Sequence, residues 1–441
     1  MLALLSRSRG LQPLRDRSFR LLFTAQFASL FGTGMAPIAV AFAVIGVHRS
    51  PSAMSMVLAA RMLPTVIFML VGGVIADRLP RHRVMVVADV VCGVAQAGTA
   101  ALIFFGVADL WNLAALQFVG GAAGAFLMPA VTGLVPQIVD GSTRKEANAL
   151  LGLSRNGARI GGAAIGGVLV AGFGPGSAIA IDAATFFVSA LLLAWVRLAA
   201  PASAFRQGFA RDLVDGWHEF RARRWVWLIS VQYAITNALG MGSFFVLGPL
   251  IAERSLGGPT AWGFIMTANA TGLVAGSVAS LHIKLDRPLL AAPAGALFIV
   301  PVVGFLAAHE PAFVIAFAAF MLGFMAAISG IFFETALQQH IPAHKLSRVT
   351  AYDIAASFSS IPLGVIVIGF VATRLGMTTT LWLAAIAVTI AGVATLAAQD
   401  VRSIGSTSPT VEAPPDAPLR LAAVVSDPRT AATPAARAAS A

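Results

Sequence analysis

Glu334, Arg159 and Asp182 are three of the ionisable residues that lie inside long apolar stretches of this sequence. A charged side chain within a bilayer costs several kcal/mol unless it is paired, so such residues are rare and are functional candidates by default. An acid in this setting can bind and release a proton or a cation, and an arginine can balance that acid or hold an anion. We therefore treat all three as candidates for proton coupling. Glu334 is favoured as the proton- or cation-binding acid, with a salt bridge to the loops as an equal alternative.

The composition shows that these residues belong to an integral membrane protein. Of the 441 residues, 58% are hydrophobic and 11% are charged, and the mean hydropathy is +0.84. Soluble domains carry about 25% charged residues. The formal net charge of +11 would suggest a nucleic-acid partner in a soluble protein. Here the positive residues lie in short loops and at the ends, so they predict orientation in a lipid bilayer and no nucleic acid.

Twelve apolar segments, each long enough to cross about 30 Å of hydrocarbon, predict an all-α membrane protein with two six-helix bundles. The approximate segments are 19–46, 53–76, 84–106, 110–138, 146–171, 177–198, 225–252, 260–283, 288–308, 311–338, 349–372 and 377–398. The expected domains are a basic tail (1–18), an N-terminal bundle (19–198), a linker (199–224), a C-terminal bundle (225–400) and a disordered tail (401–441).

The turns between these segments predict the topology. Arginine and lysine gather in every second turn, beginning with the one after the second segment, whereas the alternate turns carry few charges. Positive loops stay in the cytoplasm, so both termini are expected there. The stretches 139–144 and 341–346 lie at equivalent positions in the two halves, directly before the fifth segment and the eleventh segment. Such an internal duplication is typical of transporters that bind their substrate between two bundles.

The linker contains an aromatic stripe. Phe205, Phe209, Leu213 and Trp217 are spaced by four residues, and Phe220 continues the series, while arginines occupy the other faces. This pattern predicts an amphipathic interfacial helix that joins the two bundles, in preference to a solvated linker.

The turn after the second segment reads G-x-x-A-D-R-x-x-R-x-R, with Gly73, Asp77, Arg78 and Arg81 at its defined positions. It resembles the loop signature of the major facilitator superfamily, between the second and third helices, although Pro80 stands where that family prefers glycine. Positive-inside orientation alone would explain the arginines. The acid among them favours a functional role.

The resemblance implies a conformational latch. Asp77 would bridge to the cytoplasmic start of the eleventh helix, or to the dipole of its N-terminus, in the outward-open state. Arg78 and Arg81 would reinforce that contact through Asp140 or Asp353. The alternative that we favour for Asp353, and for Asp89 early in the third segment, is a structural pairing with Arg78 or Arg81.

The fifth segment carries a glycine-rich face that includes Gly162, Gly166 and Gly167. It resembles the helix-5 signature of superfamily antiporters, with Ala163 in place of the expected proline, and in that family the face seals the two halves against leakage. Ordinary close packing of membrane helices explains the glycines equally well. Arg155 lies four residues before Arg159 on this helix, so the two share a face.

Two further stretches, 126–150 and 182–190, resemble the third drug–proton antiporter group, which includes macrolide and siderophore exporters. The resemblance covers roughly 15–400 and implies that helices 1, 4, 7 and 10 line a cavity. Glu334 would face that cavity, whereas Asp182 would lie on a peripheral helix in a more structural role. The candidate cavity residues are Gln26, Thr33, Gln117, Gln232, Thr236, Asn237 and Phe332.

The sequence contains no ATP-binding loop, no metal-ligand motif and no catalytic motif, so we expect neither an enzyme nor a cofactor or metal. We predict a monomeric secondary transporter of the bacterial inner membrane. It would export a hydrophobic or amphipathic small molecule, as in drug efflux, in exchange for protons. A dedicated metabolite or siderophore exporter is the alternative, and a non-transporting scaffold or sensor is a less favoured one.

Overall fold

The computed structural model describes residues 9–196, 217–283, 285 and 287–403, and within these residues the chain is helical without strands. The N-terminal helices are η1 (Arg9–Arg15), α2 (Arg17–Val47), α3 (Pro51–Arg78), α4 (Arg81–Phe104), α5 (Leu110–Gly124), α6 (Leu127–Ile138), η2 (Gly141–Thr143), α7 (Arg144–Phe173) and α8 (Pro175–Ala194). The basic tail before residue 9, most of the predicted linker helix and the predicted tail after residue 403 lie outside the described residues.

The second half begins with a short helical stretch at 217–222. It continues with α10 (Arg224–Ile235), η3 (Thr236–Met241), α11 (Gly242–Ile251), η4 (Ala252–Leu256), α12 (Pro259–Ala279), η5 (Pro288–Leu290), α13 (Ala291–Ala296), α14 (Ile299–Ala307), α15 (Ala312–His340), α16 (Ala343–Phe358), α17 (Ser360–Leu375), α18 (Met377–Ala397) and α19 (Gln399–Arg402). The η3 and η4 segments are π-helical and interrupt one long apolar span, Arg224–Leu256.

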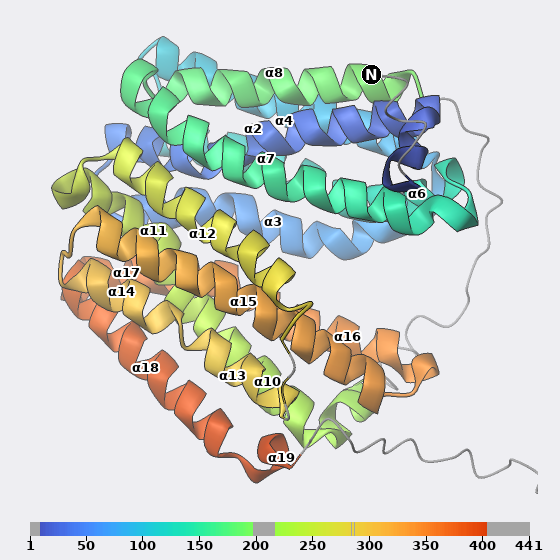
Figure 1. Cartoon of the computed structure of the whole chain (residues 1–441). Helices are drawn as coiled ribbons and strands as arrows, with labels where there is room; N and C mark the ends of the chain where they lie inside the picture. Colours follow the sequence, from blue (N-terminus) through green and yellow to red (C-terminus); the bar gives the residue numbers. More distant parts are fainter. Residues whose placement is uncertain (1–8, 197–216, 284, 286, 404–441) are drawn as a thin grey trace, which may run out of the picture.

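Ten helical spans in the described chain are long and apolar enough to cross a membrane. Two other long helices, α7 with 30 residues and α12 with 21, run beside them (Figure 1). Neither is among the ten spans; α7 contains Arg155 and Arg159, and α12 contains Thr267, Asn269 and Thr271.

The helices form two bundles (Figure 1). In the N-terminal bundle, α2 packs on α7 and α8, α4 packs on α8, and α3 packs on α5; in the C-terminal bundle, α12 and α13 pack on α15, and α14 packs on α18. The bundles touch through α7 with α12 and through α3 with α17. We call the end with the turns at 48–50 and 257–258 the closed end, because the bundles meet there. The opposite end, toward which their ribbons diverge and where residues 9 and 403 lie, is the tail end (Figure 1).

Small residues permit the tight packing within each bundle. In a bilayer, helix association relies on close backbone approach, since lipid tails are as apolar as leucine. Gly272 and Gly276 of α12 lie against the backbone carbonyls of Phe320 and Phe324 of α15, where a Cβ atom would clash with those oxygens. The α12–α15 pair is therefore closely packed along these glycines.

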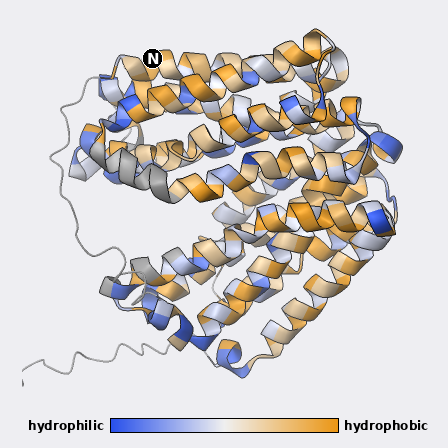
Figure 2. Ribbon diagram, turned by 180° about the vertical axis from the view of Figure 1, so that it is seen from behind, coloured by the Kyte–Doolittle hydropathy of each residue, from blue (hydrophilic) through white to orange (hydrophobic). Residues whose placement is uncertain are grey.

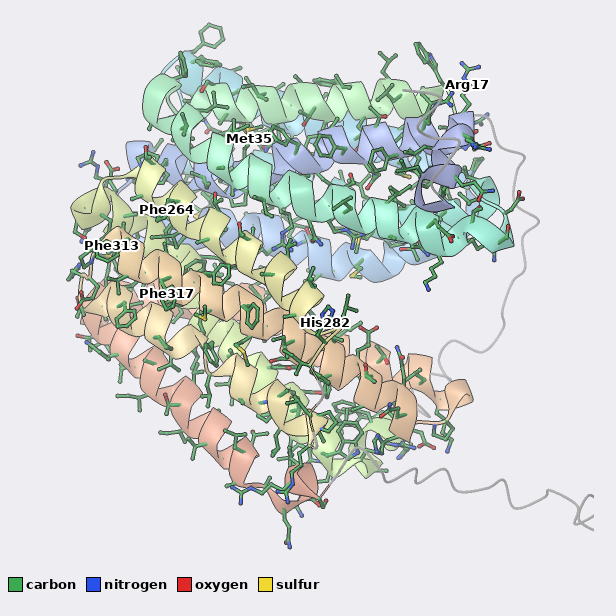
Figure 3. All side chains as sticks on the ribbon, in the orientation of Figure 1. Arg17, Met35, Phe264, His282, Phe313 and Phe317 are labelled. Atoms are coloured by element: carbon green, nitrogen blue, oxygen red, sulfur yellow. The ribbon has the colours of Figure 1, made fainter. Side chains whose placement is uncertain are left out.

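The outer surface along the helices is apolar, and polar residues gather at the two ends (Figure 2). Large hydrophobic side chains such as Phe264, Phe313 and Phe317 are 55%, 69% and 66% exposed (Figure 3). An apolar surface of this extent would associate in water. It fits a protein that is surrounded by lipid.

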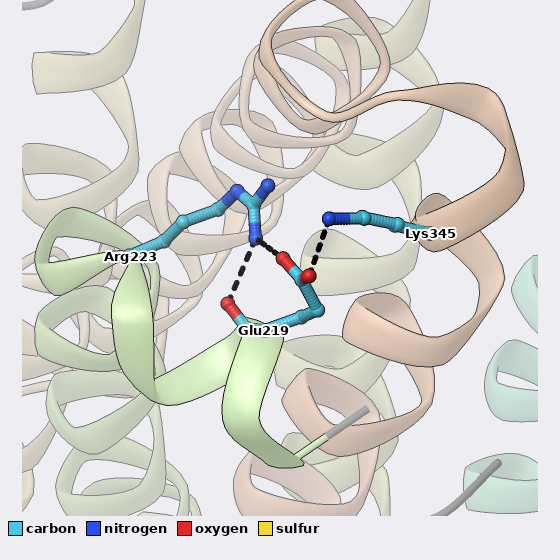
Figure 4. A network of polar contacts seen from close by, with 3 residues as sticks. All are labelled: Glu219, Arg223 and Lys345. Atoms are coloured by element: carbon cyan, nitrogen blue, oxygen red, sulfur yellow. Dashed lines mark hydrogen bonds and ion pairs between the residues drawn. The ribbon is translucent and has the colours of Figure 1, made fainter. Parts of the chain in front are cut away.

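At the tail end, residues 217–222 are held against the start of α16 (Figure 4). The Glu219 carboxylate accepts a hydrogen bond from Arg223 at 2.6 Å and another from the Lys345 ammonium group. The rings of Trp217 and Phe220 lie 5.7 Å and 6.1 Å from that of Tyr352. The described part of the predicted aromatic stripe thus packs on α16.

Candidate functional site

A chain of polar side chains crosses the N-terminal bundle from α3 to α8. Arg61 donates to the Gln117 side-chain oxygen at 2.8 Å, and Gln117 donates to the Gln96 oxygen at 2.9 Å. Gln96 then donates to the Asp182 carboxylate at 2.5 Å. One residue comes from each of α3, α5, α4 and α8. We call these four residues the polar chain.

The direction of these hydrogen bonds is fixed by their two ends. A guanidinium group can only donate, and an ionised carboxylate can only accept. Each glutamine between them must turn its oxygen toward Arg61 and its nitrogen toward Asp182. The amide dipoles therefore all align between one positive and one negative charge, which makes the chain sensitive to the charge state of Asp182.

The polar chain is buried along most of its length. Asp182, Gln117 and Gln96 are 0%, 1% and 2% exposed, whereas Arg61 is half-buried. Asp182 lies about 10 Å from the Pro175 end of α8 at the usual helix rise, which places it toward the closed end. One carboxylate oxygen, Oδ1, accepts no hydrogen bond in the described structure and faces α2, where a Cβ on Gly32 would lie 2.6 Å from it. This oxygen is free to take a proton.

Two other buried acids have neutral partners. Ser189 donates to Asp89 at 2.6 Å within the N-terminal bundle, and Ser230 donates to Asp353 at 2.5 Å within the C-terminal bundle. Both acids lie within about three turns of the tail-end start of α4 or α16. The pairings proposed for them with Arg78 or Arg81 remain predictions.

The other two coupling candidates lie apart from the polar chain. Glu334 is exposed on α15, about 9 Å from the His340 end, and has no hydrogen-bond or ion-pair partner among the described residues. Arg159 is exposed near the middle of α7, with its Cα packed near Gly34 of α2. The structure therefore joins Asp182 and Gln117, but not Glu334 or Arg159, into one network.

The predicted cavity residues divide between the two bundles. Gln26, Thr33 and Phe332 are half-buried, Gln117 belongs to the polar chain, and Thr236 is buried. The side chain of Gln232 donates to the Pro293 carbonyl at 3.0 Å, and that of Asn237 donates to the Ser357 carbonyl at 2.8 Å. These two amides are therefore engaged inside the C-terminal bundle in this conformation.

The latch residues lie at the tail end. Arg81 donates to the carbonyl of Gly133 on α6, and Asp140 is exposed before η2. Gly73, Asp77 and Arg78 belong to α3, but their side chains lie outside the described part of the structure. The latch stays a prediction.

The closed end is where the bundles come into contact. A Cβ on Gly167 of α7 would lie 2.9 Å from the Cα of Gly263 on α12, and Gly369 of α17 packs against Ser55 of α3. Arg49 and Glu253 form an exposed ion pair of 3.7 Å between the bundles. Gly162 and Gly166, by contrast, pack on α2 within the N-terminal bundle, against Gly34 and Met35.

A family model agrees with this architecture. The family described as transmembrane secretion effector matches residues 8–425, nearly the whole chain. The chain belongs to this family. A transporter of the major facilitator superfamily is thus confirmed, and with its apolar helices and bacterial relatives it is a multi-pass inner-membrane protein.

Named relatives of this transporter are distant. The multidrug efflux pump Tap of Mycolicibacterium fortuitum is 26% identical over 81% of this chain and 89% of that protein. The enterobactin exporter EntS of Escherichia coli O1:K1 / APEC is 24% identical over 80% of this chain and 84% of that protein. The uncharacterised transporter YfiS of Bacillus subtilis is 29% identical, over 42% of this chain and 43% of that protein.

Solved structures share the fold. A bacterial homologue of the lysosomal transporter Spinster, in an inward-facing and unoccupied conformation, has a TM-score of 0.65 at 13% identity, over 88% of this chain and 97% of that one. The nucleoside transporter NupG has a TM-score of 0.70 at 12% identity, over 86% and 98%. At these identities the likeness concerns the fold alone.

Sequence reasoning identified Asp182 and Gln117 as separate candidates and did not single out Gln96. A glutamine in an apolar helix is a weak signal by itself. The available clue was that α3, α4, α5 and α8 each carry a strongly polar residue in an apolar stretch, and buried polar groups require partners.

Proposed function

We propose that this transporter has twelve membrane-spanning helices with cytoplasmic termini, and exports a hydrophobic or amphipathic small molecule in exchange for protons. In this proposal α7 and α12 are the two further spans, the closed end faces the periplasm and the tail end faces the cytoplasm. The distribution of basic residues supports this orientation. The conformation is then inward-facing.

The observation that carries the proton coupling is the polar chain that ends at Asp182. An acid buried in the outer half of a membrane bundle and linked to an arginine can change its charge without losing its position. Asp182 takes the role of the coupling acid in this proposal, ahead of Glu334, because Glu334 is exposed near the end of its helix.

The polar chain offers a route from the proton to the contact between the bundles. Arg61 lies on α3 about 9 Å along the helix from Ser55, which packs against Gly369 of α17. Thr65 fixes this part of α3 to α5 through a hydrogen bond of 2.9 Å to the carbonyl of Gly121. Protonation of Asp182 removes the charge toward which Arg61 is oriented, which loosens α3 near the closed end.

A transport cycle follows from these contacts. The inward-facing state binds substrate from the cytoplasm, and the α3–α17 and α7–α12 contacts then separate while the tail end closes. In the outward-facing state, Asp77 with Arg78 and Arg81 would latch the tail end against the start of α16, aided by Asp140 or Asp353. Proton entry to Asp182 from the periplasm accompanies substrate release.

Inverted membrane vesicles with an acidic interior provide the test. We would follow accumulation of a panel of neutral, cationic and anionic amphipathic dyes by the wild type, Asp182→Asn and Glu334→Gln. The proposal predicts gradient-dependent uptake of at least one dye, lost in Asp182→Asn and retained in Glu334→Gln. No uptake of any dye by folded, inserted wild type would overturn drug efflux and favour a dedicated metabolite exporter.

A further inference from the structure

One face of α7 carries polar residues from its first turns to the middle of the helix. Asn148, Arg155 and Arg159 are exposed and Asn156 is half-buried. With 3.6 residues per turn these four side chains project within a sector of about 100°. Arg159 lies about 22 Å from the Arg144 end of α7, near the middle of the helix. This polar sector explains why α7 is less apolar than the ten spans.

Neighbouring helices show where the polar sector points. On one side of it, Gly162 packs against Gly34 of α2; on the other side, Gly167 packs against Gly263 of α12. The sector between these contacts faces the region where the two bundles oppose each other. The opposite face of α7 presents apolar side chains such as Leu153 and Val168, which are 68% and 62% exposed and face the lipid.

The flanking helices supply no negative charge. The sequence of α2 contains no acidic residue, and α12 contains no charged residue between Pro259 and Ala279. Neither Arg155 nor Arg159 has an acid partner among the described residues. The two guanidinium groups are also close enough for their like charges to act on each other. An anion bound between two adjacent cations at this depth would stabilise both of them.

We propose that Arg155 and Arg159 form a binding site for the anionic group of an amphipathic substrate, such as a carboxylate, a sulfonate or a phosphate. Guanidinium groups bind such oxyanions through paired, charge-assisted hydrogen bonds. The uncharged wall of α12 opposite them suits the apolar part of the same molecule. This inference names the substrate class and rests on the export function proposed above.

A matched pair of dyes tests the inference directly. Anilinonaphthalene sulfonate and N-phenylnaphthylamine share one aromatic skeleton and differ by a permanently charged sulfonate. Fluorescence titration of the purified protein in neutral-lipid nanodiscs should give tighter binding of the sulfonate. Arg159→Gln and Arg155→Gln should each weaken its binding roughly tenfold, as loss of a hydrogen bond to a charged group predicts. Binding of N-phenylnaphthylamine should stay unchanged.

Arg374→Gln provides the control, because Arg374 is an exposed arginine of α17 stacked 5.2 Å above the Phe370 ring and far along the chain from α7. It should leave both affinities at the wild-type value. Thermal melting would verify that each variant is folded. Equal binding of the two dyes by the wild type, or equal losses for both in Arg159→Gln, would overturn the inference.

The bilayer is a second source of the same anion. Nanodiscs with phosphatidylglycerol would therefore be compared with nanodiscs of neutral lipid. If the lipid phosphate occupies the site, phosphatidylglycerol will displace the sulfonate dye more from the wild type and from Arg374→Gln than from Arg159→Gln. If a free substrate occupies the site, displacement will be equal in all three proteins. Uptake of only neutral or cationic dyes in vesicles would defeat this inference while leaving export intact.

Discussion

The two bundles have similar helices but different interiors. The N-terminal bundle buries a chain of hydrogen bonds with a charge at each end, Arg61 and Asp182, and carries Arg155 and Arg159 on one face of α7. In the C-terminal bundle, the buried contacts at comparable depth are neutral, as in the hydrogen bond from Gln232 to Pro293 and the 2.8 Å bond from Ser329 to Ala291. Its buried acid, Asp353, lies near the tail end with a serine partner.

This difference suggests a division of labour. Neutral hydrogen bonds between helices stabilise a fixed arrangement and do not respond to pH. A buried acid joined to an arginine does respond, because its charge disappears when it binds a proton. The N-terminal bundle would then sense protons and the substrate anion, and the C-terminal bundle would act as the opposing rigid body.

Replacing one buried glutamine in each bundle should separate these roles most strongly. Gln96→Leu removes both the donor to Asp182 and the acceptor of the Gln117 side-chain N–H, so we expect transport driven by a pH gradient to fall at least tenfold. Gln232→Leu breaks a comparable bond in the C-terminal bundle and should keep gradient-dependent transport. Each change should destabilise the fold by about 1–3 kcal/mol. Vesicle uptake measures the loss of transport, and thermal melting measures the loss of stability. An equal loss of gradient-driven transport in the two variants would contradict the proposed difference between the bundles.

A second test compares a glycine at the contact between the two bundles with a glycine inside one bundle. Gly167→Val should hinder contact of α7 with α12 and shift the population toward the outward-facing state, with a severalfold rise in labelling of cysteines introduced at the closed end. Gly276→Val crowds α12 against Phe324 within one bundle and should lower the melting temperature without that shift. Buried Cys92 gives a low labelling background. Unchanged labelling in Gly167→Val would contradict the assignment of the closed end as a moving contact.

Glu219 allows a smaller test at the tail end. Hydrogen bonds from Lys345 and then Arg223 lower the pKa of Glu219 below its usual value. The stabilisation is therefore complete above the ordinary glutamate pKa and is lost as the pH falls through the lowered one. Glu219→Gln should cost about 1 kcal/mol or less at neutral pH, as for partly exposed ion pairs. Melting curves against pH should show the two proteins converging in acid; a constant difference would contradict the ion-pair account.

The smallest effect is expected for Glu334→Gln. Because Glu334 is exposed and unpaired among the described residues, the change should alter gradient-driven uptake by less than twofold. A large loss of uptake would show that the coupling acid lies in the C-terminal bundle, and would contradict the assignment of proton coupling to the N-terminal bundle.

The family and the helical membrane fold could be predicted from the sequence. Long apolar segments, the basic turns and the motif around Asp77 led to the correct family, because membrane insertion depends on features that are local in the chain. The two long helices that fail the simple test of hydropathy, α7 and α12, carry polar residues and pack on each other between the bundles.

The candidate site was less accessible to sequence reasoning. Glu334 and Asp182 look alike in the sequence, since each is a single acid in an apolar helix. Their different burial depends on which helix face meets a neighbour, and that is a tertiary property. The hydrogen bond from Gln96 to Asp182 joins residues 86 apart in the sequence, and the one from Lys345 to Glu219 joins residues 126 apart. No local sequence pattern predicts either bond.

The most direct test of proton binding at Asp182 is a count of protons released when the purified transporter binds substrate. The transported dye would be added in weakly buffered detergent solution and the pH change followed. We predict proton release by the wild type and by Asp353→Asn, and none by Asp182→Asn with its dye affinity retained. Undiminished release by Asp182→Asn would contradict the central claim that the N-terminal bundle carries the coupling proton at this residue.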